Sequence, residues 1–285
     1  MRDGFILTLQ CDDRPGLVAD VATLLAGEGA NIIDAQQFND KLNARFFMRI
    51  EFEIETGGDL ETLRGKFAPL ANAEGMEWSL RRDGEPLKVL LMVSKFDHCL
   101  NDLLYRQRVG ELNMAVVGIV SNHPREALPN TMIRDLPFHH LPITKESKPQ
   151  QEARIRALVE ETGAELVVLA RYMQILSDDM ARYLSGRCIN IHHSFLPGFK
   201  GAKPYHQAHE RGVKMIGATA HYVTADLDEG PIIHQDVEAI SHADSPEDLV
   251  RKGRDIERRV LAEAVRHHLD GRVFLNGART VVFKA

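Results

Sequence analysis

Hydrophobic and polar residues in the first third of the chain follow the periods of strands and helices. Strand patterns cover four segments: residues 4–10, 30–38, 44–54 and 76–82. In the third of these, every second residue from Phe46 to Ile54 is apolar, which is typical of a strand with one buried face. Helical spacing predicts one helix that starts near Leu17 and another over residues 59–74. The predicted order is therefore β-α-β-β-α-β.

Turn signals mark the beginning and the end of this region. Residues 12–16 read Asp-Asp-Arg-Pro-Gly, and Asp13 is expected to cap the helix that follows this turn. A second polar, turn-forming segment covers residues 81–86. We place the domain boundary there, with a first domain over residues 1–83 and a second over 87–285.

The hydrophobic pattern changes after this boundary. Uninterrupted apolar runs now alternate with helical patterns, and the runs cover residues 89–93, 115–120, 166–170 and 188–191. This pattern predicts a parallel sheet that helices cover on both faces. Two more strands, 216–223 and 232–240, are joined by a turn, and a long helix runs from Asp244 or Ser245 to about His268. We therefore expect an α/β protein with two domains.

Composition narrows the class of protein. The chain has 285 residues, of which 44% are hydrophobic and 27% are charged, as in soluble globular proteins, and its net charge of -6 disfavours a broad nucleic-acid-binding surface. Three widely spaced cysteines form neither a disulfide framework nor a zinc motif. No stretch approaches the ~20 apolar residues of a membrane span, and no signal-peptide pattern is found. We expect a cytoplasmic protein that binds neither nucleic acid nor a membrane.

Polar side chains end the strand predicted over residues 188–191. Asn190 and His192 are two residues apart, so their side chains point to the same face of the sheet. Ligands of open α/β sheets bind outside the carboxyl ends of the strands. An amide donor beside an imidazole at this place predicts a catalytic site, although a polar strand end with satisfied hydrogen bonds has the same pattern.

Two other segments follow strand ends. After His221 the chain enters an acidic turn, in which Asp226, Asp228 and Glu229 precede Gly-Pro, and an ordinary solvated turn has the same composition. Bulky side chains over residues 169–177 follow another buried strand. They form either a wall for a flat aromatic ligand or a loop that packs over the core.

The thirteen histidines raise the question of a metal site. Five lie within one stretch: His192, His193, His206, His209 and His221. A hydrolytic zinc site usually has three protein ligands, and the sequence has no His-Glu-x-x-His pattern. His192 and His193 are adjacent on a strand, so they are expected to point to opposite faces. We therefore expect no metal.

These segments together resemble the folate-dependent formyltransferases. The resemblance rests on Asn190-Ile191-His192, on residues 194–197 with Lys200-Gly201, and on Asp228 within residues 226–230. It implies a Rossmann-like domain with a mostly parallel sheet, in which Asn190, His192 and Asp228 form the catalytic group.

The same resemblance implies where folate binds, because residues 169–176 are similar to the pterin-binding loop of that family. The folate-binding residues expected are Tyr172, Met173, Gln174, Ile175, Leu176, Thr224, Ala225, Asp226 and Leu227. His221 is either a supporting neighbour of the catalytic group or an ordinary core or surface histidine.

Nearly the whole chain resembles a narrower family, the formyltetrahydrofolate deformylases, which carry an N-terminal ACT domain, a ferredoxin-like βαββαβ module. Residues 13–19 resemble the helix-opening motif of ACT domains, and residues 94–104 and His193 resemble the deformylase form of the second domain. The resemblance implies hydrolysis of 10-formyltetrahydrofolate to tetrahydrofolate and formate in one-carbon and purine metabolism, without a cofactor. It also suggests an amino-acid effector at the ACT domain and a homo-oligomer, either a dimer or a tetramer.

The loop at residues 94–98 favours water as the formyl acceptor. A phosphate-bearing acceptor suits a glycine-rich turn at a helix start, but this loop has no glycine and carries Asp97. In the expected reaction Asn190 and His192 donate hydrogen bonds to an oxyanion, while Asp228 positions the water and holds His192 in its useful protonation state. Two alternatives remain: a formyl transferase that acts on an amine such as glycinamide ribonucleotide, and a regulatory protein that only binds folate.

Overall fold

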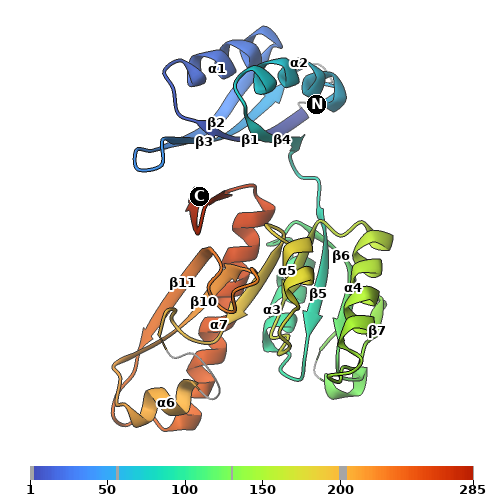
Figure 1. Ribbon diagram of the computed structural model, residues 1–285, viewed down its shortest axis with the longest axis vertical. Coiled ribbons are helices and arrows are strands. Elements are labelled where there is room, and N and C mark those ends of the chain that lie inside the picture. The colour runs from blue at the N-terminus through green and yellow to red at the C-terminus, as the bar shows by residue number, and fades with distance from the viewer. Residues whose placement is uncertain (1–2, 56–57, 130, 199–203, 285) are drawn as a thin grey trace. The chain divides into compact units, whose positions relative to one another are not determined.

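The computed structural model describes residues 3–55, 58–129, 131–198 and 204–284, and these form two compact units (Figure 1). The first unit takes its residues from 1–85, 270–274 and 281–285, and the second takes them from 86–269 and 275–280. The segments 270–274 and 281–285 thus belong with the first unit, whereas the sequence placed all of 87–285 in the second domain. The reason is apolar packing, because Phe274 and Phe283 form a cluster with Phe47.

The first unit is a four-stranded antiparallel sheet in the order β2-β3-β1-β4. Its elements are β1 (Asp3–Asp12), α1 (Leu17–Gly27), β2 (Ala30–Asp40), β3 (Arg45–Ile54), α2 (Leu60–Ala73) and β4 (Glu77–Arg82). Both helices pack on one face, where Val21 of α1 and Phe67 of α2 share a core with Phe5 and Ile50 of the sheet. The predicted β-α-β-β-α-β order is confirmed.

The first helix begins without the cap expected from the sequence. The residue before α1 is Gly16, at a left-handed φ of 98°, and no side chain caps the helix. Asp13 instead accepts a hydrogen bond of 2.8 Å from Asn39 Nδ2 in β2. The expected capping role of Asp13 was therefore wrong, because a partner distant in the sequence binds its carboxylate.

The second unit contains a seven-stranded sheet in the order β11-β10-β9-β8-β5-β6-β7. The strands are β5 (Leu87–Val93), β6 (Met114–Ser121), β7 (Phe138–His140), β8 (Leu166–Leu169), β9 (Cys188–His192), β10 (Met215–Tyr222) and β11 (Ile232–Ala239). The strands from β5 to β9 run parallel, and β10 is antiparallel to both of its neighbours. This confirms the mostly parallel sheet expected from the sequence, although β7 was not foreseen.

Helices cover both faces of this sheet. They are α3 (His98–Arg108), α4 (Lys148–Thr162), α5 (Asp178–Tyr183), α6 (Pro204–Glu210) and α7 (Pro246–Leu269). α4 and α5 share a core with Leu90 and Met92 of β5, whereas α7 packs on β9, β10 and β11 and against α3 (Figure 1). Residues 125–127 form a 3-10 turn, and β12 (Val273–Asn276) pairs with β13 (Arg279–Val282). None of the helices described has the length and apolar character needed to cross a membrane.

The strand order indicates where an open α/β sheet would bind a ligand. The chain adds β6 and β7 on one side of β5 and then returns to add β8 and β9 on the other side, so the loops after β5 and β8 flank a topological switch point. Hydrogen bonds join these two loops, because Ser94 Oγ accepts from Met173 N (2.9 Å) and Ser94 N donates to Arg171 O (3.1 Å). The crevice beside these loops is the place where α/β sheets bind ligands.

Candidate active site

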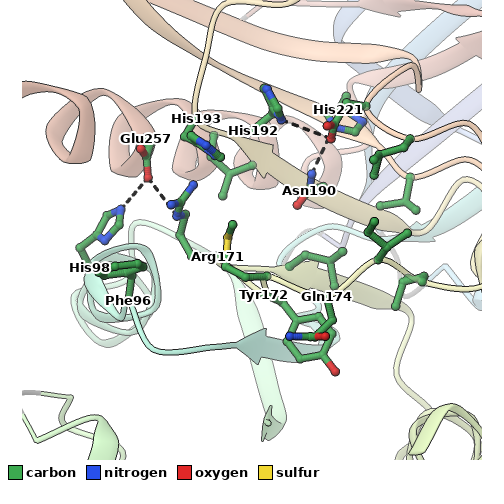
Figure 2. Close-up of a pocket in the computed structure, with 18 of the residues that line it drawn as sticks. Phe96, His98, Arg171, Tyr172, Gln174, Asn190, His192, His193, His221 and Glu257 are labelled. Atoms are coloured by element: carbon green, nitrogen blue, oxygen red, sulfur yellow. Dashed lines mark hydrogen bonds and ion pairs between the residues drawn. The ribbon is translucent and has the colours of Figure 1, made fainter. Parts of the chain in front are cut away.

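β9 brings Asn190 and His192 to the edge of a cavity of about 650 Å³ (Figure 2). The strand lies between β8 and β10, with Asn190 opposite His221 and His192 opposite Thr219. Asn190, His192 and His221 all line the cavity. The amide and the imidazole expected from the sequence therefore share one site with a third polar side chain.

The hydrogen bonds of His221 orient the amide of Asn190. His221 Nδ1 lies 2.9 Å from the carbonyl oxygen of Tyr222, which only accepts, so Nδ1 carries a proton. Burial lowers the pKa of His221, so the ring is neutral and Nε2 accepts a hydrogen bond. Asn190 Nδ2, 3.2 Å away, supplies that bond and keeps its second N–H for a ligand. The structure thus places His221 beside the predicted catalytic group.

Asp228 pairs with His192 across the site. Asp228 Oδ1 lies 3.2 Å from His192 Nδ1 and 3.9 Å from His221 Nε2. The hydrogen bond with His192 holds the pKa of Asp228 below its ordinary value, so this carboxyl is charged at neutral pH. His192 is buried, and its Nε2 has no hydrogen-bond partner within the described part of the chain. One nitrogen of the imidazole is thus fixed by the carboxylate, and the other remains for a reacting group.

The turn that carries Asp228 is shaped by its Gly-Pro ending. Asp228 has a left-handed φ of 57°, a conformation that aspartate adopts more readily than most residues other than glycine. Tyr222 N donates to the carbonyl oxygen of Pro231 at 2.9 Å and closes the loop. A Cβ on Gly230 would lie 1.7 Å from Tyr222 O, so only glycine permits this closure. The acidic turn is therefore not a simple solvated loop, because its closure brings Asp228 back to β9.

The predicted folate-binding residues form another part of the cavity lining. Those that line it are Tyr172, Met173, Gln174, Ile175, Leu176, Thr224, Asp226 and Leu227. Ala225 is not part of the lining. Met173, Ile175 and Leu227 are at least half exposed although they are apolar. Burial raises the pKa of Tyr172 to about 12, so its hydroxyl stays protonated. An apolar surface with a few polar groups suits a flat heterocycle.

A buried carboxylate organises a second side of the cavity, which the sequence did not reveal. Glu257 of α7 has a side chain only 2% exposed, and it accepts from Tyr205 Oη at 2.7 Å and pairs with His98 Nε2 at 2.8 Å. Arg171 Nε lies 3.4 Å from the same carboxylate (Figure 2). Burial raises the pKa of Glu257, but the hydrogen bond from His98 and the charge of Arg171 outweigh it, so the net shift is downward. Gly253 makes this contact possible, because a Cβ there would lie 2.1 Å from Tyr205 Cζ.

The sequence contains one signal from which the buried position of Glu257 could have been predicted. Glu257 follows Leu249 and Gly253 at intervals of four, on the buried face of α7. A carboxylate among core positions of a helix indicates a buried partner, because charges are rarely buried unpaired. The partners themselves come from α3, from the loop after β8 and from α6, and no local pattern joins those segments.

His192 and His193 were expected to point to opposite faces of one strand, which was an argument against a metal site shared by the two. The structure does not support this expectation. β9 ends at His192, so His193 is free of the strand alternation, and the two rings stack with centroids 5.1 Å apart at 26°. Burial and the charge of Arg171 lower the pKa of His193 to about 4. Within the described residues, the group whose atoms are close enough to share an ion is instead His98, Cys99 and Glu257.

The family motif continues after β9 with residues 194–197, Lys200 and Gly201. Lys200 and Gly201 lie outside the described residues. Leu196 N donates to Thr219 Oγ1 at 3.0 Å, and Thr219 Oγ1 donates to Ser194 O at 2.9 Å. These bonds fasten the segment after β9 to β10, which supports the position of His192.

Comparisons with known proteins agree with this architecture. Residues 87–265 match the Formyl transferase family, and residues 5–67 match the ACT domain family. The chain is 51% identical over 282 residues to a formyltetrahydrofolate deformylase from Corynebacterium sp. (strain P-1), with 98% of each chain covered. The crystal structure of formyltetrahydrofolate deformylase from Burkholderia mallei has a TM-score of 0.94 at 54% identity and covers 99% of this chain and 100% of its own.

A related transferase covers less of the chain. The crystal structure of glycinamide ribonucleotide transformylase 1 from Symbiobacterium toebii covers 72% of this chain and 98% of its own, with a TM-score of 0.63 and 29% identity. Similarity to the deformylases instead extends over both units. This chain therefore belongs to the formyltetrahydrofolate deformylase family.

Proposed function

We propose that this chain hydrolyses the C–N amide bond of 10-formyltetrahydrofolate and releases tetrahydrofolate and formate. The observation that carries the proposal is the arrangement of Asn190, His192 and Asp228 around one end of the cavity. It offers two hydrogen-bond donors and one charged acceptor, which are the groups that addition of water to a formyl carbon requires. Side chains of the protein supply all of these groups, and we propose that no cofactor takes part.

Asp228 acts on the water in this mechanism. Its carboxylate is charged, and it accepts a proton from the water as the oxygen adds to the formyl carbon. The same carboxylate fixes His192 through Nδ1, at 3.2 Å. The imidazole is therefore aligned before substrate arrives, so its orientation need not change during the reaction.

Asn190 and His192 act on the oxygen of the formyl group. Water addition turns this oxygen into an oxyanion, which accepts from the free N–H of Asn190 and from Nε2–H of His192. The C–N bond then breaks and its electrons return to nitrogen-10, which takes a proton from His192 or through a water. The formyl carbon leaves as formic acid. Of its O–H proton and the proton held by Asp228, one restores His192 and the other is released to solvent, which leaves formate.

The competing function is transfer of the formyl group to an amine such as glycinamide ribonucleotide. In the structure Asp97 directly precedes α3, so a negative charge lies where a helix start would otherwise favour a phosphate. This disfavours a phosphate-bearing acceptor. The test is a parallel assay of formate release and of formylated glycinamide ribonucleotide, with equal substrate. We expect formate at the same rate with or without the amine, and formylated amine as the main product would contradict the proposal.

We propose further that the first unit is a regulatory module that binds an amino acid, and that the chain acts as a homo-oligomer in the cytoplasm. The match to the ACT domain over residues 5–67 supports the first point. The free, buried cysteines Cys11, Cys99 and Cys188 suit a reducing compartment. Formate release measured with each amino acid in turn, together with light scattering, tests these points. No response to any amino acid would remove the regulatory role.

A further inference from the structure

The cavity has a polar side that the proposed folate wall and catalytic group leave unused. Figure 2 shows Phe96, His98, Arg171 and Glu257 on this side, and Arg254 also belongs to its lining. Two guanidinium groups and one carboxylate give this side an excess of positive charge. A binding site for a small anion is the chemistry that such a lining suits.

Arg171 carries hydrogen-bonding capacity that the protein does not use. The residue is 9% exposed, and its Nε and Nη1 have no hydrogen-bond partner among the described residues. Its counter-ion Glu257 is 3.4 Å away, but shorter contacts from Tyr205 and His98 occupy that carboxylate. A buried cation with unsatisfied N–H groups is unfavourable unless an acceptor arrives.

Two further features single out this guanidinium. Arg171 has a φ of 65°, a left-handed conformation that is strained for a residue with a long side chain and that a glycine would adopt without strain. The guanidinium carbons of Arg171 and Arg254 lie 6.0 and 5.9 Å from the ring centroid of Phe96. Both guanidinium groups therefore border the same ring in the lining of the cavity.

We propose that Arg171, assisted by Arg254, forms a carboxylate subsite that holds the formate product before it leaves the cavity. This inference rests on the proposed function. Hydrolysis turns a neutral formyl amide into a carboxylate in a cavity that also contains the charged Asp228, which repels it. A planar guanidinium accommodates a planar carboxylate through paired N–H groups. The glutamate tail of the folate carries the same chemistry and is the second source of a carboxylate.

The first arm of the test measures binding without turnover. The affinity for [13C]formate is measured from the broadening of its NMR signal as protein is added. The proteins compared are the full-length chain and its variants Arg171→Gln, Arg171→Lys and Arg254→Gln. The matched control is Arg251→Gln. Arg251 is an exposed arginine of α7, the helix that also carries Arg254, and it pairs with Asp248. We expect about tenfold weaker formate binding in Arg171→Gln, a smaller loss in Arg254→Gln and none in the control. Thermal unfolding confirms that each variant is folded.

The second arm identifies the source of the carboxylate. The KM of each variant is compared for 10-formyltetrahydrofolate and for the analogue that lacks the glutamate. Weaker formate binding with equal KM changes for both substrates assigns the subsite to formate. Unchanged formate binding with a raised KM only for the glutamate-bearing substrate assigns it to the tail. If Arg171→Lys and Arg254→Gln change neither quantity, the subsite does not exist. Because the first arm needs no catalysis, an inactive protein with a working subsite would contradict only the proposed function.

Discussion

Two pairs of histidine and carboxylate line the same cavity, and they differ in how much bonding capacity remains. His192 Nδ1 lies 3.2 Å from Asp228, and His98 Nε2 lies 2.8 Å from Glu257. Asp228 is 16% exposed, whereas Glu257 is 2% exposed and also accepts from Tyr205. In the first pair His192 keeps Nε2 without a partner, so this pair can still bind a reacting group.

The comparison shows that ionisation alone does not identify a catalytic carboxylate. The pKa of Asp228 and that of Glu257 are both lowered, the first mainly by His192 and the second by His98 and Arg171 against the effect of burial. The surroundings of the carboxylate distinguish them, because Glu257 is buried and also accepts from Tyr205, whereas Asp228 is partly exposed to the cavity. We therefore assign the catalytic role to the Asp228 pair and a structural role to the Glu257 pair. Mutation of the first should lower kcat more than stability, and mutation of the second should lower stability more than kcat.

The largest effect on turnover is expected for Asp228→Asn. The amide cannot take a proton from water and, being uncharged, pairs less strongly with His192, so kcat should fall on the order of 10³-fold or more. Stability should change little, because the side chain lies at the cavity edge. Steady-state kinetics and thermal unfolding measure the two quantities. A kcat within tenfold of the wild type would remove Asp228 from the mechanism.

Loss of either oxyanion donor should have the next largest effect. We expect Asn190→Ala and His192→Ala each to lower kcat about 10²–10³-fold, the usual effect of removing one such donor. His209→Ala is the matched control, since His209 is exposed on α6 and does not line the cavity. Equal small effects in all three variants would show that the oxyanion is stabilised elsewhere.

Glu257→Gln should affect stability more than turnover. The change leaves Arg171 buried without its counter-charge, and removal of one partner from a buried ion pair costs about 3 kcal/mol of unfolding free energy. Glu263→Gln on the same helix, a partly exposed side chain paired with Arg266, should cost less than about 0.5 kcal/mol. Denaturant unfolding measures both. If Glu257→Gln instead abolished kcat at full stability, the two carboxylates would have exchanged roles.

Acid should destabilise the protein partly through His193. Its pKa is about 4 in the folded chain and 6.5 ordinarily, so between these values the unfolded chain binds more protons. The contribution of neutral His193 is thus present above pH 6.5 and is lost as pH falls toward 4. We expect a smaller drop in unfolding free energy between pH 7 and 5 for His193→Gln than for the wild type. An identical drop in both proteins would show that His193 does not cause it.

The smallest effect is expected from metal removal. The group His98, Cys99 and Glu257 is close enough to share an ion, but burial raises the pKa of Cys99 well above 9.0, so its thiol stays protonated. Glu257 already accepts from His98 and Tyr205. Extensive dialysis against a chelator should leave formate release unchanged. Loss of activity that zinc restores would require a metal in the mechanism.

The fold was predictable because its signals are local. Alternation from Phe46 to Ile54 and the uninterrupted apolar runs of the second unit depend on neighbouring residues, and the structure places strands there. The short strand β7 and the C-terminal segments had no such signal. Phe274 and Phe283 find their place only through Phe47, more than 200 residues earlier, which no local pattern reveals.

The site was predictable in part for the same reason. Asn190 and His192 share a strand, so their common face follows from alternation alone, whereas the approach of Asp228 depends on loop closure at Gly230. The family resemblance named Asp228, but the residues themselves gave only an acidic turn. Arg171 and Glu257 come from separate elements and meet only in the folded chain. Ion pairs between distant segments have no fixed separation in the sequence, so no sequence pattern predicts them.

Hydrolysis by this chain is tested by following the oxygen of water into the product. The protein is incubated with 10-formyltetrahydrofolate in water enriched in ¹⁸O, without any amine, and formate is analysed by mass spectrometry. We expect one ¹⁸O atom in each formate molecule formed, since water attacks the formyl carbon. Absence of formate, or formate without the label, would contradict hydrolysis by this chain.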